Sequence, residues 1–170
     1  MAGQQPAQPT RSTSAERVIA APAHDIFEVL ADPGQHPVID GSSSVVRPLR
    51  GNPERLEMGS RFGMRMHLLV PYVIHSRVVE YEQDQRIAWC HRVGHRWRYE
   101  LEPLDPLDPL DPDPDSPGAT RTRVTETFDW STAIFPPAIE ILGFPARNLP
   151  GMARTLERLD RHVRGEPLDG

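Results

Sequence analysis

Apolar and polar residues alternate along most of the chain, the pattern of strands with one buried and one solvated face. The alternation first occurs near the N-terminus and resumes, after two helical segments, between residues 42 and 132. Short turns rich in Gly, Pro, Asn and Asp divide this stretch, so we expect neighbouring strands to pair antiparallel. The seven predicted strands are Ser14–Ala20, Ser43–Leu49, Ser60–Leu69, Val73–Tyr81, Arg86–Arg92, His95–Leu104 and Thr120–Thr132.

Helical spacing of apolar residues appears between the first two strands and again near the C-terminus. After Pro22, a helix is expected to end at the sequence Asp32-Pro33-Gly34, and a second short helix or turn follows to Asp40. The apolar side of the C-terminal helix comprises Met152, Leu156, Leu159 and Val163. Several prolines, the last of them Pro150, interrupt the segment before it, so we expect a turn and a short helix near Ala138–Leu142 to precede the long helix.

The alternation also predicts which side chains face the interior. On the third strand the apolar face holds Phe62, Met64, Met66 and Leu68. On the sixth strand Trp97, Tyr99 and Leu101 lie opposite arginines and glutamates. One face of the sheet is therefore wet and the other is covered, and the C-terminal helix is the segment expected to cover it.

This order of elements resembles the START/Bet v 1-like (SRPBCC) superfamily, in particular its bacterial polyketide cyclase/dehydrase and lipid-transport branch, over about residues 14 to 164. The resemblance implies an α+β helix-grip fold: a curved antiparallel sheet of about seven strands around a long C-terminal helix, with two short helices after the first strand. It also implies a hydrophobic ligand in a cavity between sheet and helix. The segments that carry it are ERVIAAPAHDIFEVLADPGQHPVIDG, VVEYEQDQRIAWCH, HRWRYELEPL, TRVTETFDW and MARTLERLDRHV.

The chain is expected to form one domain with a short tail at each end, and two of its segments have a biased composition. Residues 1–13 are expected to form a disordered tail, residues 14–165 the ligand-binding domain, and residues 166–170 a short C-terminal tail. Within the domain, the segment 103–118 contains five Asp and no Lys or Arg, and its repeated Pro and Asp predict a mobile loop. This loop accounts for the whole formal net charge of −5, so the remainder is near neutral and nucleic-acid binding is not expected.

The inward-facing positions hold aromatic and Met side chains that suit the adaptable wall of an apolar pocket, although a filled core has the same composition. Glu126 and His91 also occupy inward-facing strand positions and are the candidates for general acid–base chemistry. The alternative is that each only forms a hydrogen bond that stabilises the fold, or that a strand bulge turns them toward water. In the related family the segment 32–41 lies over the cavity mouth; there Ile39 could plug the opening, with His36 or Asp40 at its rim. The predicted ligand-binding residues are Ile39, Met64, Met66, Trp89, His91, Trp97, Tyr99, Glu126, Phe128 and Trp130.

Other chemistries lack their signatures in the sequence. The histidines are not at metal-ligand spacing, and no phosphate-binding, dinucleotide-binding or nucleophile-elbow motif occurs, so neither a metal nor a cofactor is expected. The single cysteine, Cys90, has outward parity and suits a small filler or a subunit contact in a homodimer. One cysteine, no leader-like start and no long apolar run predict a cytoplasmic protein without membrane insertion.

Three functions therefore remain open on the sequence. The first is binding of a hydrophobic or aromatic small molecule, polyketide-like or lipid-like. The second is a polyketide cyclase, aromatase or dehydratase that uses the inward polar residues. The third is a non-catalytic stress-response or co-chaperone-like interaction module, because fold alone does not decide function.

Overall fold

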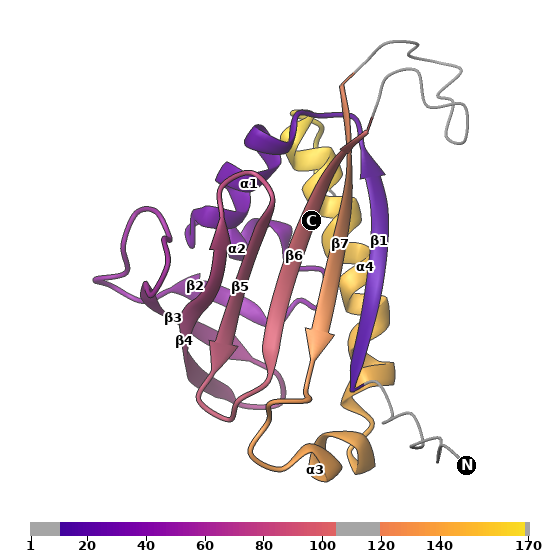
Figure 1. The fold of residues 1–170 in the computed structure, drawn as a ribbon. Helices are drawn as coiled ribbons and strands as arrows, with labels where there is room; N and C mark the ends of the chain where they lie inside the picture. The colour runs from indigo at the N-terminus through magenta and orange to yellow at the C-terminus, as the bar shows by residue number, and fades with distance from the viewer. Residues whose placement is uncertain (1–10, 105–119, 169–170) are drawn as a thin grey trace, which may run out of the picture.

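A curved seven-stranded antiparallel sheet wraps around one long helix in the computed structural model, which describes residues 11–104 and 120–168 (Figure 1). This confirms the α+β helix-grip fold. The strand order is β1-β7-β6-β5-β4-β3-β2, so only the contact between β1 and β7 joins strands distant in sequence. The strands are β1 (Ser12–Ile19), β2 (Val45–Pro48), β3 (Arg61–His67), β4 (Pro71–Glu82), β5 (Arg86–His91), β6 (Arg96–Leu104) and β7 (Arg121–Asp129).

Four helices accompany the sheet in the described part of the chain. Two lie between β1 and β2: α1 (Ala23–Ala31) and α2 (His36–Ile39). The others follow β7: α3 (Pro136–Ile141) and α4 (Phe144–Val163). The helix α4 runs behind the sheet and covers its concave face (Figure 1). Its buried side chains include Met152, Leu156 and Leu159, the apolar stripe predicted from the sequence.

Several predicted boundaries were wrong, and each has a local cause. The helix α4 begins at Phe144 rather than after Pro150, because Pro145 occupies the first turn, where no hydrogen bond is lost. Pro150 lies inside the helix at an exposed position and removes one backbone bond without ending the helix. The strand β1 starts at Ser12, since Ser12 and Thr13 pair with β7, so these two residues do not belong to the expected tail.

The predicted Pro/Asp loop also begins later than expected, because Pro103 and Leu104 still pair with β7. The rest of that segment and residues 1–10 lie outside the described residues. Leu68, expected on the covered face, lies beyond the end of β3 and is exposed. A strand residue is buried only while the ladder continues, and the alternation of the sequence does not mark where it stops.

A close backbone contact fixes α2 against α4. A Cβ atom on Gly41 would lie only 2.3 Å from the backbone nitrogen of Thr155, so only glycine fits there. Thr155 Oγ1 accepts a hydrogen bond from the Gly41 N–H at 3.0 Å. Two arginines of α4 donate to the α2 segment, Arg154 to the Gly41 carbonyl and Arg158 to the Val38 carbonyl. The segment beside the concave face is therefore held to the long helix by named polar contacts.

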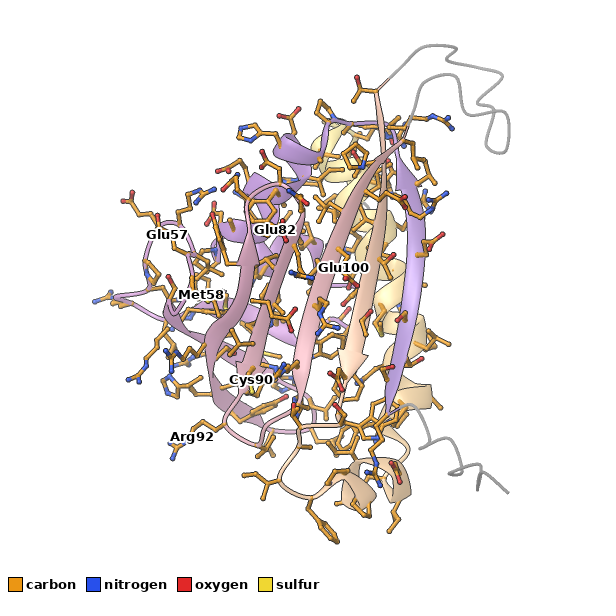
Figure 2. All side chains as sticks on the ribbon, in the orientation of Figure 1. Glu57, Met58, Glu82, Cys90, Arg92 and Glu100 are labelled. Atoms are coloured by element: carbon orange, nitrogen blue, oxygen red, sulfur yellow. The ribbon has the colours of Figure 1, made fainter. Side chains whose placement is uncertain are left out.

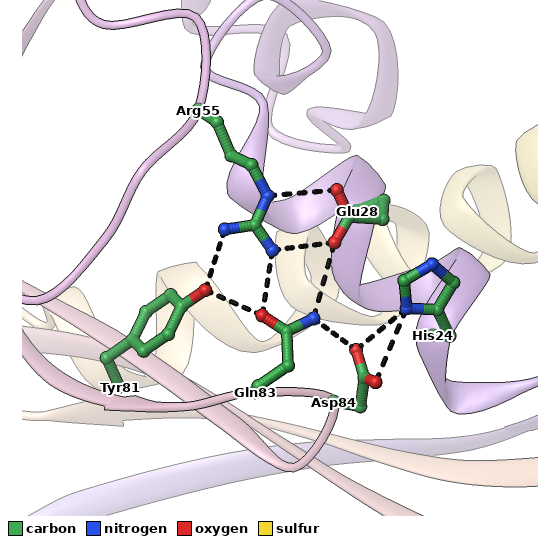
Figure 3. A network of polar contacts seen from close by, with 6 residues as sticks. All are labelled: His24, Glu28, Arg55, Tyr81, Gln83 and Asp84. Carbon is green, nitrogen blue, oxygen red and sulfur yellow. Dashed lines mark hydrogen bonds and ion pairs between the residues drawn. The ribbon is translucent and has the colours of Figure 1, made fainter.

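A polar network ties α1 to the turn between β4 and β5 (Figure 3). Arg55 donates to both carboxylate oxygens of Glu28, at 3.0 and 2.7 Å, and also to Tyr81 and Gln83. These bonds lower the pKa of Glu28, with the Arg55 hydrogen bond as the main cause. The network therefore anchors α1, whose residues Ile26, Phe27 and Leu30 are buried in the core.

Candidate functional site

A buried carboxyl group lies on the concave face of the sheet. Glu126 is on β7, and its side chain accepts a hydrogen bond at Oε1 from the hydroxyl of Tyr99 on β6, at 2.9 Å. The other carboxyl oxygen, Oε2, is buried and has no hydrogen-bond partner within the part of the chain that the structure describes. Burial raises the pKa of Glu126 to about 8, and the nearby charge of Asp40 adds to the rise. The group is thus largely protonated at neutral pH.

Asp40 supplies the negative charge beside this group. It follows α2, and its carboxylate accepts hydrogen bonds from the backbone N–H groups of Ser42, Ser44 and Val45. Those bonds hold the carboxylate in place at the end of α2. Burial and the charge of Asp40 also raise the pKa of Tyr72, which places Asp40 near the start of β4 as well.

Aromatic rings form one wall next to Glu126. The imidazole of His36 stacks on Trp89 with ring centres 5.0 Å apart, and Trp89 lies 5.5 Å from the ring of Tyr99. His36 Nε2 donates to the Leu30 carbonyl at 2.9 Å, and burial lowers the His36 pKa. His36 is therefore a neutral ring fixed in the wall, and not the exposed rim residue that the sequence suggested.

A second aromatic cluster continues the concave face toward α3. Phe128 contacts Trp97 and Trp130, with ring centres 4.9 and 5.5 Å apart. Met152 of α4 completes the cluster. Trp130 Nε1 donates to Glu140 at 3.0 Å, so its polar edge is engaged.

His91, the other candidate for acid–base chemistry, does not contact Glu126. Its Nδ1 lies 2.9 Å from Ser76 Oγ, and its ring is 4.7 Å from that of His95. Burial, with a contribution from His95, lowers the pKa of His91 to about 3. Both residues were expected on the same face of the sheet, but two side chains on one face need not contact each other when they lie on different strands. The group that pairs with Glu126 is Tyr99.

The structure places the remaining predicted residues against the interior. Trp97 and His91 are half-buried, whereas the other eight of the ten predicted ligand-binding residues are buried. Their role in ligand binding stays a prediction. One feature was not predicted: a pocket of about 630 Å³ that opens on the outer side of the sheet and reaches the predicted residue His91. Its residues come from three strands and a loop, so no local pattern in the sequence marks it.

Among the described residues, one group brings three possible metal ligands within 4.8 Å of one another: His24, Glu28 and Asp84. Both oxygens of Glu28 already accept from Arg55, and Asp84 accepts from Gln83 (Figure 3). We therefore assign this group to the anchoring network of α1. None of the helices in the described part of the chain combines the length and apolarity that a membrane crossing requires.

A curved sheet that grips a helix and presents an apolar, aromatic concave face defines the class of helix-grip ligand-binding folds. Comparison with known proteins specifies the family. Residues 10–164 match the family described as polyketide cyclase / dehydrase and lipid transport, and the chain belongs to that family.

The relatives extend this assignment. The Mycobacterium tuberculosis protein Rv0088 is 40% identical over 159 residues, which cover 86% of this chain. The chain spans 62% of the length of that relative. Among solved structures, protein Ms6760 of Mycobacterium smegmatis has a TM-score of 0.62 at 16% identity and covers 92% of both chains. Protein NE0264 of Nitrosomonas europaea has a TM-score of 0.63 at 16% identity and covers 93% of this chain and 97% of its own. These two structures support the fold.

Proposed function

We propose that the protein binds a small apolar or aromatic molecule between the sheet and α4, and that Glu126 donates a hydrogen bond to a carbonyl group of that molecule. The observation that carries the proposal is the buried oxygen Oε2 of Glu126, which has no partner among the described residues. A buried polar atom without a partner costs about 1–3 kcal/mol. A ligand that supplies the missing partner recovers that free energy on binding.

The protonation state selects the kind of ligand. A protonated carboxyl group has one O–H donor, and because Oε1 accepts from Tyr99, that donor belongs on Oε2. A ketone, ester or amide oxygen accepts such a bond. The charge of Asp40 nearby disfavours an anionic group at the same place. The neighbouring rings favour an apolar or aromatic body attached to the carbonyl.

Entry of a ligand requires some of these side chains to separate, because they are buried against one another. The segment of α2 is the element we expect to move, since it contributes both His36 and Ile39 to the wall. Its hydrogen bonds from Arg154 and Arg158 are the contacts that resist this opening.

The test uses a neutral fluorescent naphthyl ketone and the same naphthalene without its carbonyl. With a Glu126 pKa of about 8, the protonated fraction falls about tenfold between pH 7 and pH 9. The affinity of the wild type for the ketone should fall by about the same factor, while the affinity for the hydrocarbon stays constant. Glu126→Gln keeps a donor that does not titrate, so its ketone affinity should be independent of pH.

A Glu126→Leu variant provides the matched loss of the donor at similar volume. It should bind ketone and hydrocarbon alike. Equal pH profiles for the two probes in the wild type would contradict the role of Glu126, and no binding of either probe would contradict the concave site itself.

A second function is supported by the same pKa. A carboxyl group that titrates near neutral pH is well suited to general acid catalysis, as a cyclase or dehydratase would require. This alternative predicts that Glu126→Gln binds a poly-β-keto thioester as the wild type does but no longer accelerates its cyclisation. If the wild type does not accelerate it either, the protein is a binder.

A further inference from the structure

We propose that the outer face of the sheet carries a second site, for a small organic anion with at least two negative charges on phosphate or carboxylate oxygens. The site is the pocket of about 630 Å³ at β3, β4 and the end of β5. Its charged lining comes from residues of outward parity, Arg61 and Arg77 among them, while Phe62, Ser76 and His91 form its inner border. Figure 2 shows Cys90 and Arg92 on the outer face near the lower end of β5. The site is independent of the proposed function of the concave face.

One wall of the pocket is a loop that is fastened to the sheet. Asn52 binds the backbone of Gly63 twice, donating to its carbonyl and accepting from its N–H, both at 2.9 Å. A Cβ atom on Gly63 would lie 2.6 Å from Leu49 Cδ1, so the Leu49 side chain packs directly on the backbone of β3. These contacts fix the loop residues Leu49 to Asn52 beside the outer face of the sheet, so the hollow is a built feature of the fold.

The pocket is strongly basic. Four arginines line it, Arg50, Arg61, Arg77 and Arg92, and the described residues that line it include no Asp or Glu. None of the four makes an ion pair among residues 11–104 and 120–168. This holds although the protein as a whole has a formal net charge of −5.

Two of these arginines oppose each other directly. Arg61 of β3 and Arg77 of β4 are Cα partners in the antiparallel ladder. Like charges in that relation destabilise a sheet, and no acidic side chain in the described part of the chain forms an ion pair with either arginine. A bound anion between the two guanidinium groups would offset the repulsion.

The geometry indicates the class of ligand. Guanidinium groups match phosphate and carboxylate oxygens in two parallel hydrogen bonds, which favours a multiply charged oxyanion over a halide or a single weak charge. The volume is that of a metabolite-sized molecule. Leu49 and Val79 offer apolar contact for its carbon skeleton.

Cys90 provides a reporter inside the site, because it lines the pocket and is the only cysteine of the chain. Its alkylation by iodoacetate, an anion, is compared with its alkylation by neutral iodoacetamide. The ratio of the iodoacetate rate to the iodoacetamide rate does not depend on the intrinsic reactivity of the thiol. The same ratio measured for glutathione is the reference. The positive field should raise the ratio about three- to tenfold above that reference at low salt.

Variants then assign the effect to the arginines. Arg77→Gln should lower the ratio, and the double variant Arg61→Gln, Arg77→Gln should return it to the glutathione value. Arg147→Gln, which removes an exposed charge from α4, is the matched control and should leave it unchanged. Pyrophosphate and citrate should each protect Cys90 in the wild type and not in the double variant, and the more effective of the two identifies phosphate or carboxylate as the preferred group.

Three results would overturn the proposal. The first is a ratio that the double variant does not change. The second is no protection by either anion at millimolar concentration. The third is protection by DNA or by vesicles of anionic lipid alone, which would make the basic face a surface for a large partner. Binding of the neutral naphthyl ketone to the double variant is measured in parallel, so failure of this site is distinguished from failure of the concave one.

Discussion

Arginines on the outer face of the sheet are used in two opposite ways. Over β5 and β6, Arg98 donates twice to Glu80 of β4, at 2.6 and 2.9 Å, and Arg96 and Arg86 lie 3.5 and 3.6 Å from the same carboxylate. Over β3 and the end of β5, Arg61, Arg77 and their neighbours surround a hollow whose described lining residues include no Asp or Glu.

Arginines that are paired with Glu80 stabilise the fold, whereas the arginines of the pocket are free to bind a ligand. An arginine already paired with a carboxylate must give up that bond before it can bind a ligand, and the lost bond subtracts from the affinity. An unpaired arginine has no such bond to lose. Residues of one type on one face of one sheet thus have different roles, and the position of a single glutamate decides which.

The largest expected effect comes from removing that glutamate. Glu80→Gln leaves three arginines close together without their anion, and charge-assisted hydrogen bonds of this kind contribute about 1.5–3 kcal/mol. We expect the free energy of unfolding to fall by about 2 kcal/mol in denaturant titrations. Glu82→Gln is the control, because the Glu82 carboxylate forms an exposed ion pair with Arg86, and its loss should cost about 0.5 kcal/mol or less. An equal loss of unfolding free energy in Glu80→Gln and Glu82→Gln would show that the Glu80 cluster has no special structural role.

The same pair predicts how stability depends on acid. The hydrogen bond from Arg98 is the main cause that lowers the pKa of Glu80 below 4.5. A carboxyl group with a lowered folded-state pKa stabilises fully above its unfolded-state value and loses that contribution as the pH falls through the folded-state value. The stability difference between wild type and Glu80→Gln should therefore be constant from pH 7 to about 5 and shrink below pH 4.5. A difference that grows in acid would contradict the assignment.

Neutralising one arginine beside Glu80 and one arginine of the pocket compares the two groups directly. Arg98→Gln breaks two short bonds and should lower the free energy of unfolding by about 1 kcal/mol. Arg77→Gln breaks none among the described residues. A loss of the same size in both variants, measured by thermal and chemical unfolding, would show that Arg77 has a structural role as well.

The smallest expected effect is a gain. Because Arg61 and Arg77 repel each other, Arg77→Gln should raise the free energy of unfolding by a few tenths of a kcal/mol at low salt, within the roughly 0.2–1 kcal/mol range of cross-strand pairs. Added salt screens this repulsion, so the gain should disappear near molar ionic strength. A gain that persists there would have a cause other than charge.

Much of the fold was predictable, since strand and helix periods are local properties of the sequence. The same periods placed Glu126 inside, and the structure has it buried. The partner of Glu126 was not predictable, because parity tells which face a residue occupies and not how far along the neighbouring strand it lies. Tyr99 meets Glu126 through the register of β6 and β7, which the sequence does not display.

The basic pocket was hidden for a related reason. Its arginines are far apart in the sequence and form no basic run. Only the pairing of β3 with β4 and of β4 with β5 brings Arg61, Arg77 and the vicinity of Cys90 together. The two hydrogen bonds between Asn52 and the Gly63 backbone hold the loop that forms one wall of the pocket. Such a site depends on tertiary register, and no residue-level pattern predicts it.

The bulge in β4 allows the outer face of the sheet to change without changing the concave face. Val78 pairs with Trp89 and Glu80 with Ala88, so Val79 is an additional residue, and it points into the outer pocket. Removing Val79 would restore a regular strand with every other side chain of β4 still on its present face. A deletion of one codon could therefore reshape the outer pocket while the concave face keeps its residues, so the two sites could be gained or lost independently.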